Sequence, residues 1–271
     1  MKDLRGKVVL ITGAARGMGK LHAANFAREG SVVVLTDVDE AELDKTVEGL
    51  KSQGYQAHAY KLDVSDRDAC FALAEKVKSE VGPIDVLVNN AGITECVPVL
   101  DQSESALRRM TDVNYLSQVW MMQAVVPDMV RRRSGHVVNV ASIAGKVGTA
   151  MMGGYCATKH AVIGITDAIR QELRGSGVQF TLIEPGYVST GMFEGGNIPF
   201  ITSWQDPQKV SDALISGVKK NKGEVCVPWF NVRQVAFARG LCVPRFVDAV
   251  FHIFGVDKSM DDWRKDECRP F

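Results

Sequence analysis

Short apolar runs alternate with longer amphipathic segments over most of this chain. The runs are rich in β-branched residues and almost continuously apolar, which predicts strands at 8–12, 32–36, 57–62, 86–89, 137–141 and 180–183. Strands lose their polar alternation where helices cover both faces of a parallel sheet. The pattern therefore predicts an α/β fold, with a doubly wound parallel sheet flanked by helices on both faces.

Helix signals fall between these runs. Asp39 and Asp66 stand where the second and third helices are expected to begin, and an aspartate there can accept hydrogen bonds from free backbone N–H groups. Gly82 and Pro83 are expected to end the third helix before the next strand. No internal repeat or flexible linker interrupts residues 1–271, so we expect a single domain.

Composition narrows the functions that this fold can serve. The chain has 271 residues, of which 46% are hydrophobic, enough for a well-buried core. Its 32 Lys and Arg balance 32 Asp and Glu, so we expect no basic face for nucleic acid. The first apolar stretch, 8–11, is too short for a signal peptide or a membrane span. Six scattered cysteines show no metal-ligand spacing, and we expect reduced thiols, no metal and a cytoplasmic location.

A glycine-rich turn follows the first predicted strand. Residues 12–19 read Thr-Gly-Ala-Ala-Arg-Gly-Met-Gly, and a helical segment comes directly after them. Gly13, Gly17 and Gly19 would let the backbone approach a phosphate closely, and free N–H groups at a helix N-terminus attract an anion. This order indicates a Rossmann-type pyrophosphate site, although the spacing differs from G-x-G-x-x-G and such a turn can also be purely structural.

A carboxylate at the end of the second predicted strand favours NAD as the cofactor. Asp37 can accept hydrogen bonds from the adenosine ribose hydroxyls there and repel a 2′-phosphate. Arg16 in the turn acts in the opposite direction, because a guanidinium can pair with that phosphate. The repulsion is the stronger discriminator, so NADP is the less favoured cofactor. The alternative for Asp37 is an exposed acid at a strand end.

Tyr155 and Lys159 form a pair with an evident chemical use. They are four residues apart at the start of a long helical segment, so they share one helix face. A neighbouring ammonium favours the phenolate, which would bring the pKa of the tyrosine closer to the operating pH for proton exchange with an alcohol oxygen. Such pairs are also common on solvated helix faces.

Further motifs give this pair its context. The turn at 12–19, Asn89–Gly92, Asn114, Ser142 and Pro185-Gly186 occur in this order, and with the Tyr-x-x-x-Lys pair the chain resembles the short-chain dehydrogenase/reductase family over about its first 190 residues. The resemblance implies a nicotinamide-dependent oxidoreductase acting on an alcohol or ketone, with hydride transfer and no metal.

The resemblance also implies a role for each catalytic position. Tyr155 is expected to be the general acid/base, and Lys159 to lower its pKa and bind the nicotinamide ribose. Ser142 is expected to hold and polarise the substrate oxygen, and Asn114 to hold a water that links Lys159 to solvent. From the residues alone, Ser142 also fits a helix cap, and Asn114 a helix residue bonded to backbone.

The glycine turn, Asp37 and the family resemblance together imply seventeen positions that contact the cofactor. They lie in the turn, after the second to fourth strands, in the catalytic pair and in a loop on the nicotinamide side: Gly13, Arg16, Gly17, Met18, Gly19, Asp37, Asp63, Val64, Asn90, Ala91, Gly92, Tyr155, Lys159, Pro185, Gly186, Val188 and Thr190. Residues 1–184 would then form the cofactor-binding core, and 185–271 the substrate loop and C-terminal segment.

Apolar and flexible side chains surround the expected substrate position. Methionines and aromatics suit a bulky apolar alcohol or ketone, such as a steroid, a retinoid or a lipid, although ordinary core packing is the alternative. The expected substrate contacts are Ser142, Met151, Met152, Tyr155, Met192 and Phe193.

The C-terminal segment 229–256 is apolar with arginines interspersed. It could cover the pocket, pack against another subunit or lie on a membrane surface. Residues 257–261 resemble the tail of the retinol and 17β-hydroxysteroid dehydrogenase branch of the family. The family resemblance suggests a homodimer or homotetramer joined through the fourth and fifth long helices.

Two other functions fit the same motifs. One is an NADP-dependent carbonyl or 3-ketoacyl reductase. The other, of a different class, is a non-catalytic dinucleotide-responsive binding protein that kept the fold and lost turnover. The complete set of Asn114, Ser142, Tyr155 and Lys159 weighs against the second.

Overall fold

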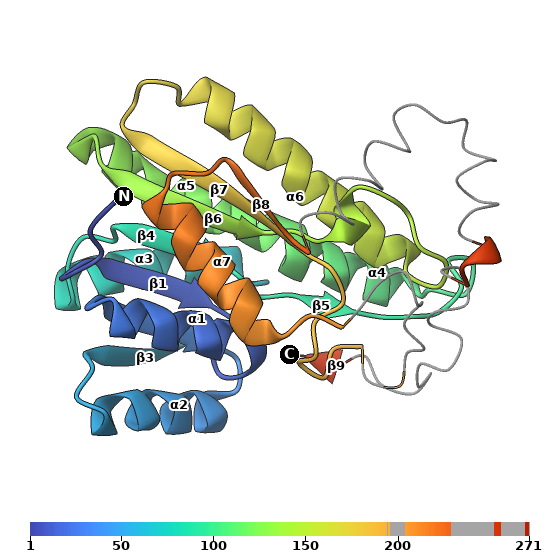
Figure 1. Ribbon diagram of the computed structural model, residues 1–271, viewed down its shortest axis with the longest axis horizontal. Helices are drawn as coiled ribbons and strands as arrows, with labels where there is room; N and C mark the ends of the chain where they lie inside the picture. The colour runs from blue at the N-terminus through green and yellow to red at the C-terminus, as the bar shows by residue number, and fades with distance from the viewer. Residues whose placement is uncertain (194, 196–203, 229–251, 256–268, 271) are drawn as a thin grey trace.

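The computed structural model describes residues 1–193, 195, 204–228, 252–255 and 269–270 (Figure 1). Their centre is one parallel sheet of seven strands in the order β3-β2-β1-β4-β6-β7-β8. The strand order reverses between β1 and β4, which leaves a crevice at the carboxyl ends of these strands. The strands are β1 (Val8–Thr12), β2 (Val32–Asp37), β3 (Ala57–Lys61), β4 (Val86–Asn89), β6 (Gly135–Val140), β7 (Val178–Pro185) and β8 (Glu224–Val227).

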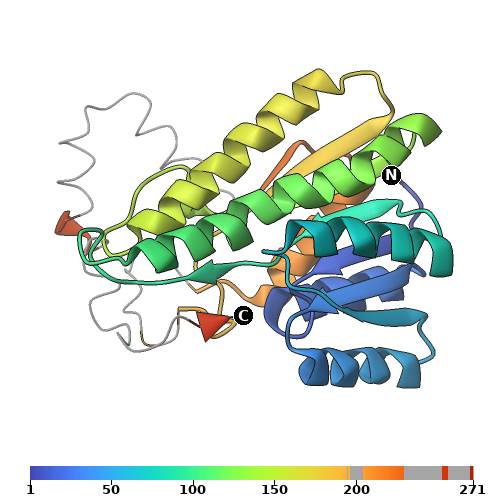
Figure 2. The ribbon, with the colours of Figure 1, turned by 180° about the vertical axis from the view of Figure 1, so that it is seen from behind.

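Helices cover both faces of the sheet (Figures 1 and 2). A short antiparallel pair, β5 (Ile93–Thr94) and β9 (Arg269–Pro270), lies outside it. Two short turns, η1 (Asp112–Leu116, a π-helix) and η2 (Ile143–Gly145, a 3₁₀-helix), complete the described elements. The α-helices are α1 (Gly17–Arg28), α2 (Glu40–Ser52), α3 (Arg67–Glu80), α4 (Glu104–Thr111), α5 (Ser117–Arg132), α6 (Gly153–Glu172) and α7 (Pro207–Lys219).

Strand β1 has four apolar residues in a row before Thr12, and the packing of the sheet explains this pattern. Val9 and Ile11 pack into the cluster that includes residues of α1, α2 and α7. Val8 and Leu10 pack into the other cluster, with residues of α3, α5 and α6. A strand with a core on each face favours apolar side chains at nearly every position, and the predicted doubly wound fold is confirmed.

Most of the predicted elements are present with shifted ends. Strands β6 and β7 extend the predicted runs at 137–141 and 180–183, since pairing continues through His136 and Gln179. The caps are confirmed: Asp39 accepts from Glu42 N at 3.2 Å, and Asp66 from Ala69 N at 3.0 Å. Strand β8 was not predicted, because it is a four-residue edge strand that begins with a glutamate.

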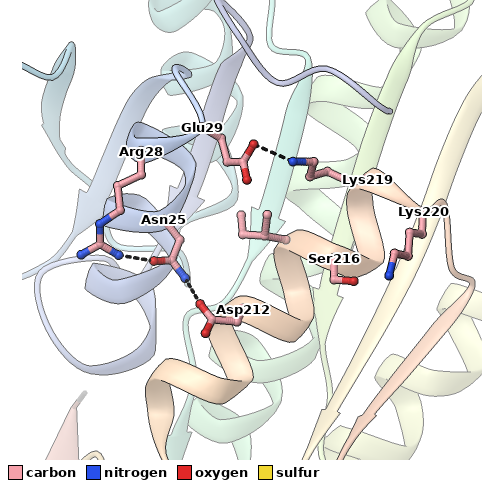
Figure 3. Close-up of a pocket in the computed structure, with 8 residues that line it drawn as sticks. Asn25, Arg28, Glu29, Asp212, Ser216, Lys219 and Lys220 are labelled. Atoms are coloured by element: carbon pink, nitrogen blue, oxygen red, sulfur yellow. Dashed lines mark hydrogen bonds and ion pairs between the residues drawn. The ribbon is translucent and has the colours of Figure 1, made fainter.

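Helices α1 and α7 lie side by side on one face, with a polar pocket along their seam (Figure 3). Asn25 donates to Asp212 at 2.9 Å, and Lys219 pairs with Glu29 at 2.8 Å. Beneath this rim the contact is apolar, through residues such as Val210. The seam anchors α7 and the adjoining β8 to the edge of the sheet.

Among the described helices, none combines the length and the apolar character needed to cross a membrane. Four cysteines fall in the described part of the chain, and all four are buried free thiols: Cys70, Cys96, Cys156 and Cys226. Cys242 and Cys268 lie outside the described residues.

Candidate active site

The turn after β1 is shaped by glycines that no other residue could replace without movement. Gly13 has φ +64°, and a Cβ added there would lie 2.8 Å from Ala91 Cα. A Cβ at Gly19 would overlap the Gly13 carbonyl oxygen. Asn90 Nδ2 donates at 3.0 Å to both Thr12 O and Gly13 O, which joins the turn to the segment after β4. The backbone surface therefore stays open for a ligand.

A small pocket follows this turn. Helix α1 begins at Gly17, and the side chain of its N-cap residue, Arg16, makes no capping hydrogen bond. The free N–H groups and the dipole of this twelve-residue helix suit an anion such as a pyrophosphate. The pocket brings together Gly13, Arg16, Gly17, Met18, Asn90, Gly92, Thr190 and Met192. Residues of the predicted phosphate turn and nicotinamide-side loop thus meet in one place.

A second pocket shares Gly13 and Gly92 with the first. Asp37 is buried at its base, where Oδ2 accepts from Ala15 N at 3.0 Å and Oδ1 from Asp39 N at 3.1 Å. Beside it, Arg16 forms an ion pair with Asp39. The pocket lining contains the predicted positions Gly13, Asp37, Asp63, Val64, Ala91 and Gly92, and further residues that the motifs did not single out: Val38, Leu62, Ser65, Ile93, Arg109 and Val113.

The groups that line these two pockets suit the two halves of a dinucleotide. One offers free backbone N–H groups and no side chain at the glycines, and the other offers a carboxylate beside apolar walls. The residues that would hold the two halves of such a cofactor are therefore those of the turn and those after β2, β3 and β4.

Tyr155 and Lys159 lie together on α6. Both side chains are buried, and Lys159 Nζ lies 5.5 Å from the centroid of the Tyr155 ring. Lys159 Nζ also donates to Val140 O, at the end of β6, at 3.0 Å. Ser142 comes two residues after that carbonyl, hydrogen-bonds with Tyr155, and donates to Pro185 O at 3.3 Å. Three predicted catalytic residues thus converge at the ends of β6 and β7.

Burial changes the protonation of this pair in opposite directions. It raises the pKa of Tyr155, and the hydrogen bond with Ser142 only partly opposes this. It lowers the pKa of Lys159 to about 8. The net direction for Tyr155 is opposite to the expected lowering by Lys159, because loss of solvent disfavours the phenolate.

Asn114 lies at the centre of the π-helical turn between α4 and α5. Its Oδ1 accepts from Ile93 N at 2.8 Å, and its Nδ2 donates to Ile93 O at 2.9 Å and to Thr158 Oγ1 at 3.1 Å. The side chain thus binds β5 to α6 next to Lys159. Ser142 likewise has a structural contact, since its Oγ accepts from Ala144 N and caps η2. Both residues therefore have the local roles that were considered as alternatives.

Two residues outside the motifs fix where α6 begins. Gln102 Oε1 accepts from Gly154 N at 3.1 Å, in the first turn of the helix. A Cβ at Gly154 would lie 2.7 Å from Met110 Cε, so glycine allows α4 to pack closely against α6. Gln102 lies in a loop without any periodic pattern, and no sequence signal identifies it.

Aromatic side chains surround the approach to Tyr155. Phe193 meets the Tyr155 ring edge-to-face with centroids 6.2 Å apart, and Tyr187 meets Phe193 at 5.3 Å. Trp204 extends the group, 6.5 Å from Tyr187. Tyr187 was not predicted, although its position directly after Pro185-Gly186 was a usable signal.

The remaining predicted positions are placed as follows. Met152 is buried, and Met151 is half-buried in a left-handed conformation with φ +66°. Val188 is buried in the core beside α7 and bridges to Gln205. Gly186 N donates to Val227 O at 2.7 Å, which joins the loop to β8. The segments 229–251 and 256–261 lie outside the described residues.

One cluster near this loop has metal-ligand atoms, and we expected no metal. Glu184, Glu224 and Cys226 hold their ligand atoms within 4.8 Å of one another. Lys146 Nζ lies 3.0 Å from Glu184 and 2.9 Å from Glu224, so one ammonium already pairs with both carboxylates.

Comparison with known proteins identifies the family of this chain. Residues 7–197 match the family model described as short chain dehydrogenase. The chain belongs to this family. As a short chain dehydrogenase it is an oxidoreductase that acts on CH–OH groups, interconverting an alcohol and a ketone with a nicotinamide dinucleotide.

Several named proteins are similar to this short chain dehydrogenase over most of their length. Ketoacyl reductase HetN of Nostoc sp. (strain PCC 7120 / SAG 25.82 / UTEX 2576) is 36% identical, over 94% of this chain and 92% of that protein. Epidermal retinol dehydrogenase 2 of Mus musculus is 34% identical, over 84% and 76%. 17-beta-hydroxysteroid dehydrogenase 13 of Mus musculus is 33% identical, over 86% and 78%.

Solved structures of the family superpose on the same fold. A short chain dehydrogenase/reductase from Burkholderia phymatum in complex with NAD has a TM-score of 0.81 and 26% identity, covering 87% of this chain and 93% of its own. A metagenomic short-chain oxidoreductase in complex with NADP has a TM-score of 0.73 and 28% identity, covering 83% and 97%. Family members therefore use either dinucleotide.

Proposed function

We propose that this protein transfers a hydride between NAD(H) and a secondary or hydrophobic alcohol or ketone, with Tyr155, Lys159, Ser142 and Asn114 as the catalytic set. The observation that carries the proposal is the convergence of the first three at the carboxyl ends of β6 and β7, where Lys159 Nζ lies 3.6 Å from the Cβ position of Gly92, a residue that lines both pockets. In the short chain dehydrogenase family, such a place is where an alcohol meets the cofactor.

Each of the four catalytic side chains is proposed to have a separate role in proton transfer. When bound, the nicotinamide accepts or supplies the hydride. Tyr155 donates its hydroxyl proton to the carbonyl oxygen in reduction, and takes the alcohol proton in oxidation. Ser142 Oγ, now bonded to Pro185 O, is proposed to hold the same oxygen. The Lys159 ammonium offsets negative charge on Tyr155. Asn114 binds the main chain at Ile93 in β5, near Lys159. By family resemblance, Asn114 also holds a water for proton exchange.

The cofactor is proposed to be NAD. Asp37 lies buried in the pocket of Asp63 and Val64, and its carboxylate would repel a 2′-phosphate there, although Arg109 also lines this pocket. The one cation in the turn, Arg16, is paired with Asp39. Both features support a diphosphate nucleotide that carries a free ribose hydroxyl.

The substrate is proposed to be apolar, in the manner of a retinoid, steroid or lipid. Support comes from the edge-to-face group Tyr155, Phe193, Tyr187 and Trp204, which presents apolar ring surface next to the reacting hydroxyl. The names of the retinol and hydroxysteroid relatives support the same class.

A second candidate is an NADP-dependent carbonyl or 3-ketoacyl reductase. The likeness to a ketoacyl reductase at 36% identity favours it. A panel of retinol, estradiol, decan-2-ol and a 3-ketoacyl thioester, each assayed with both cofactors, separates the two. A preference for the thioester with NADPH would replace the first candidate by the second.

The test of catalysis is Tyr155→Phe. Removing the hydroxyl should lower kcat by about three orders of magnitude or more, since Tyr155 is the proposed proton donor to the substrate oxygen. Binding of NADH, followed by fluorescence, should stay within about twofold. Near-normal turnover would refute the assignment, and no turnover of any panel substrate by wild type would favour the non-catalytic binding function.

Two surfaces outside the site complete the proposal. An apolar groove between α5 and α6 is proposed to bind a second copy of the chain. The groove is lined by Val119, Met122, Gln123, Val126, Pro127, Val130, Ile165, Ile169, Glu172 and Leu173.

Peripheral membrane contact through 229–256 stays a prediction. The described part of that segment exposes Ile253 and Phe254, and co-sedimentation with phospholipid vesicles tests it.

A further inference from the structure

Gln118 is a buried polar side chain next to the catalytic set. It lies in the first turn of α5, directly after the π-helical turn that carries Asn114, and is only 1% exposed. Its Nε2 donates to Asn114 O at 3.1 Å and to Val140 O at 3.4 Å. π-Helical turns inside longer helices often occur at functional sites. The side chain therefore joins the main chain at Asn114 to the end of β6.

The second of these acceptors is shared with Lys159. Val140 O receives Lys159 Nζ at 3.0 Å as well as Gln118 Nε2. A carbonyl with two donors holds both of them at a fixed separation, and the position of that carbonyl depends on both bonds. Gln118 thus takes part in placing the ammonium, although it does not touch Tyr155.

The orientation of the carboxamide follows from its neighbours. Both groups that face Nε2 are carbonyl oxygens, which only an N–H can approach. Oε1 must then point away from them, and in the described part of the chain no donor bonds to it. Burying an amide oxygen without a hydrogen-bond donor costs free energy of folding. An apolar residue of the same size would fill the space without that cost.

We propose that Gln118 is a positioning residue for the reaction: its neutral amide holds the carbonyls of Asn114 and Val140, and through Val140 it fixes the ammonium of Lys159 relative to Tyr155. This inference rests on the proposed roles of Tyr155 and Lys159. A neutral donor is needed there, because a negative group at this place would stabilise the ammonium and oppose the phenolate.

Two variants and one control test the proposal. Gln118→Met keeps the length of the side chain and removes both polar groups, and Gln118→Glu keeps the shape and adds a carboxylate. Gln171→Met is the matched control, since Gln171 Nε2 also donates to a main-chain carbonyl four residues earlier, Asp167 O at 3.2 Å, but lies exposed further along α6.

The first measurement is the titration of Lys159 in the cofactor-free protein, by NMR of ¹³Cε-labelled lysine with Lys159→Arg for assignment. Gln118→Glu should raise the pKa of Lys159 by about one unit, because an opposite charge favours the ammonium. Gln171→Met should leave it unchanged. An unchanged titration in Gln118→Glu, together with a wild-type kcat in Gln118→Met, would overturn the proposal.

The second measurement is oxidation of the fastest alcohol in the panel, with its deuterated form to isolate hydride transfer. Gln118→Met should lower kcat by about five- to tenfold with KM and NADH binding within twofold, since only the geometry of Lys159 has changed. Gln118→Glu should move the rising limb of kcat/KM to higher pH by about one unit, because the added charge raises the pKa of Tyr155.

The results with Tyr155→Phe and with the Gln118 variants distinguish failure of the proposed catalytic set from failure of the role proposed for Gln118. If Gln118→Met does not fold, Gln118→Glu decides through the titration and the pH profile. If Tyr155→Phe abolishes turnover while both Gln118 variants match wild type, only the role of Gln118 is refuted. If Tyr155→Phe retains turnover, the proposed catalytic set fails first, and the titration of Lys159 still shows whether the side chain at position 118 acts on the ammonium.

Discussion

At the residue scale, burial is the dominant influence on the catalytic pair. It raises the pKa of Tyr155 and lowers that of Lys159, so both groups are pushed toward their neutral forms. At neutral pH the phenol keeps its proton and the lysine, with its pKa near 8, still carries most of its charge. A proton donor beside a cation suits the reduction of a ketone.

This protonation pattern predicts a pH dependence. Because the pKa of Lys159 is lowered to about 8, its charge is present below that pH and lost above it. We expect kcat/KM for ketone reduction to fall as pH rises through about 8, measured by consumption of NADH over pH 6 to 10. A profile that stays flat to pH 10 would show that the ammonium is not required.

Asp37 predicts the cofactor preference. Asp37→Asn removes the charge and keeps the size, so a 2′-phosphate would no longer be repelled. We expect wild type to bind NADH at least about tenfold more tightly than NADPH, and Asp37→Asn to lose most of this ratio, measured by fluorescence titration. Asp44→Asn, on the exposed face of α2, is the control.

Tighter binding of NADPH by wild type would reverse the cofactor assignment. Asp37→Asn is also expected to cost about 1 kcal/mol of stability, because Asp37 accepts from Ala15 N and Asp39 N and an amide has only one acceptor oxygen. Thermal unfolding separates this loss from the change in cofactor ratio.

Sequence patterns identify the residues of this site better than they describe their environment. The spacing of Tyr155 and Lys159 predicted one helix face, and the structure has both on α6. The direction of the Tyr155 pKa could not be predicted, because it depends on which distant segments exclude water. Gln102 and Arg109 were missed for the same reason: their contacts with the site arise only when α4 packs against it.

At the scale of elements, the turn between β1 and α1 carries a prediction of its own. Gly13→Ala combines a left-handed backbone, φ +64°, with a contact of 2.8 Å to Ala91 Cα. Gly6→Ala is the matched control, since Gly6 has φ +66° and open space around its Cβ position. Both should lose about 1 kcal/mol to backbone strain.

Only Gly13→Ala should weaken the binding of NADH, by about tenfold or more, since the turn must move away from the segment after β4. Fluorescence titration and thermal unfolding measure the two effects separately. Equal dinucleotide affinity in the two variants would mean that the turn does not form the phosphate site.

Strands and helices differed in how well their ends could be predicted. Aspartate caps at Asp39 and Asp66 are local signals, so the starts of α2 and α3 were correct. The limits of β6, β7 and β8 depend on neighbouring strands. Pairing with β7 brings His136 into β6, and β8 exists because β7 offers it a partner. Such non-local pairing leaves little trace in an apolar pattern.

For the whole molecule, the groove between α5 and α6 predicts self-association. Ile169 lies in this groove, and a two-fold interface would bring in two copies of any charge placed there. We expect Ile169→Glu to halve the mass measured by light scattering, because buried unpaired carboxylates oppose association. Leu100→Glu, which changes a 95% exposed leucine outside the groove, should keep the mass of wild type.

A monomeric wild type would remove the proposal of a second copy in this groove. A mass that is unchanged in Ile169→Glu would place the subunit contact elsewhere. Tyr155 and the glycine turn lie outside the groove, so the variant monomer should still bind NADH.

The reversal of strand order between β1 and β4 has a consequence for how the protein is made. The turn at Gly13 is held by Asn90, so it gains its ligand-ready shape only after the chain through β4 has been synthesised and has paired with β1. The loop at Pro185 is joined later still, by β8. A growing or truncated chain therefore has no complete dinucleotide site. Binding of the cofactor can stabilise the protein only after the whole sheet has formed.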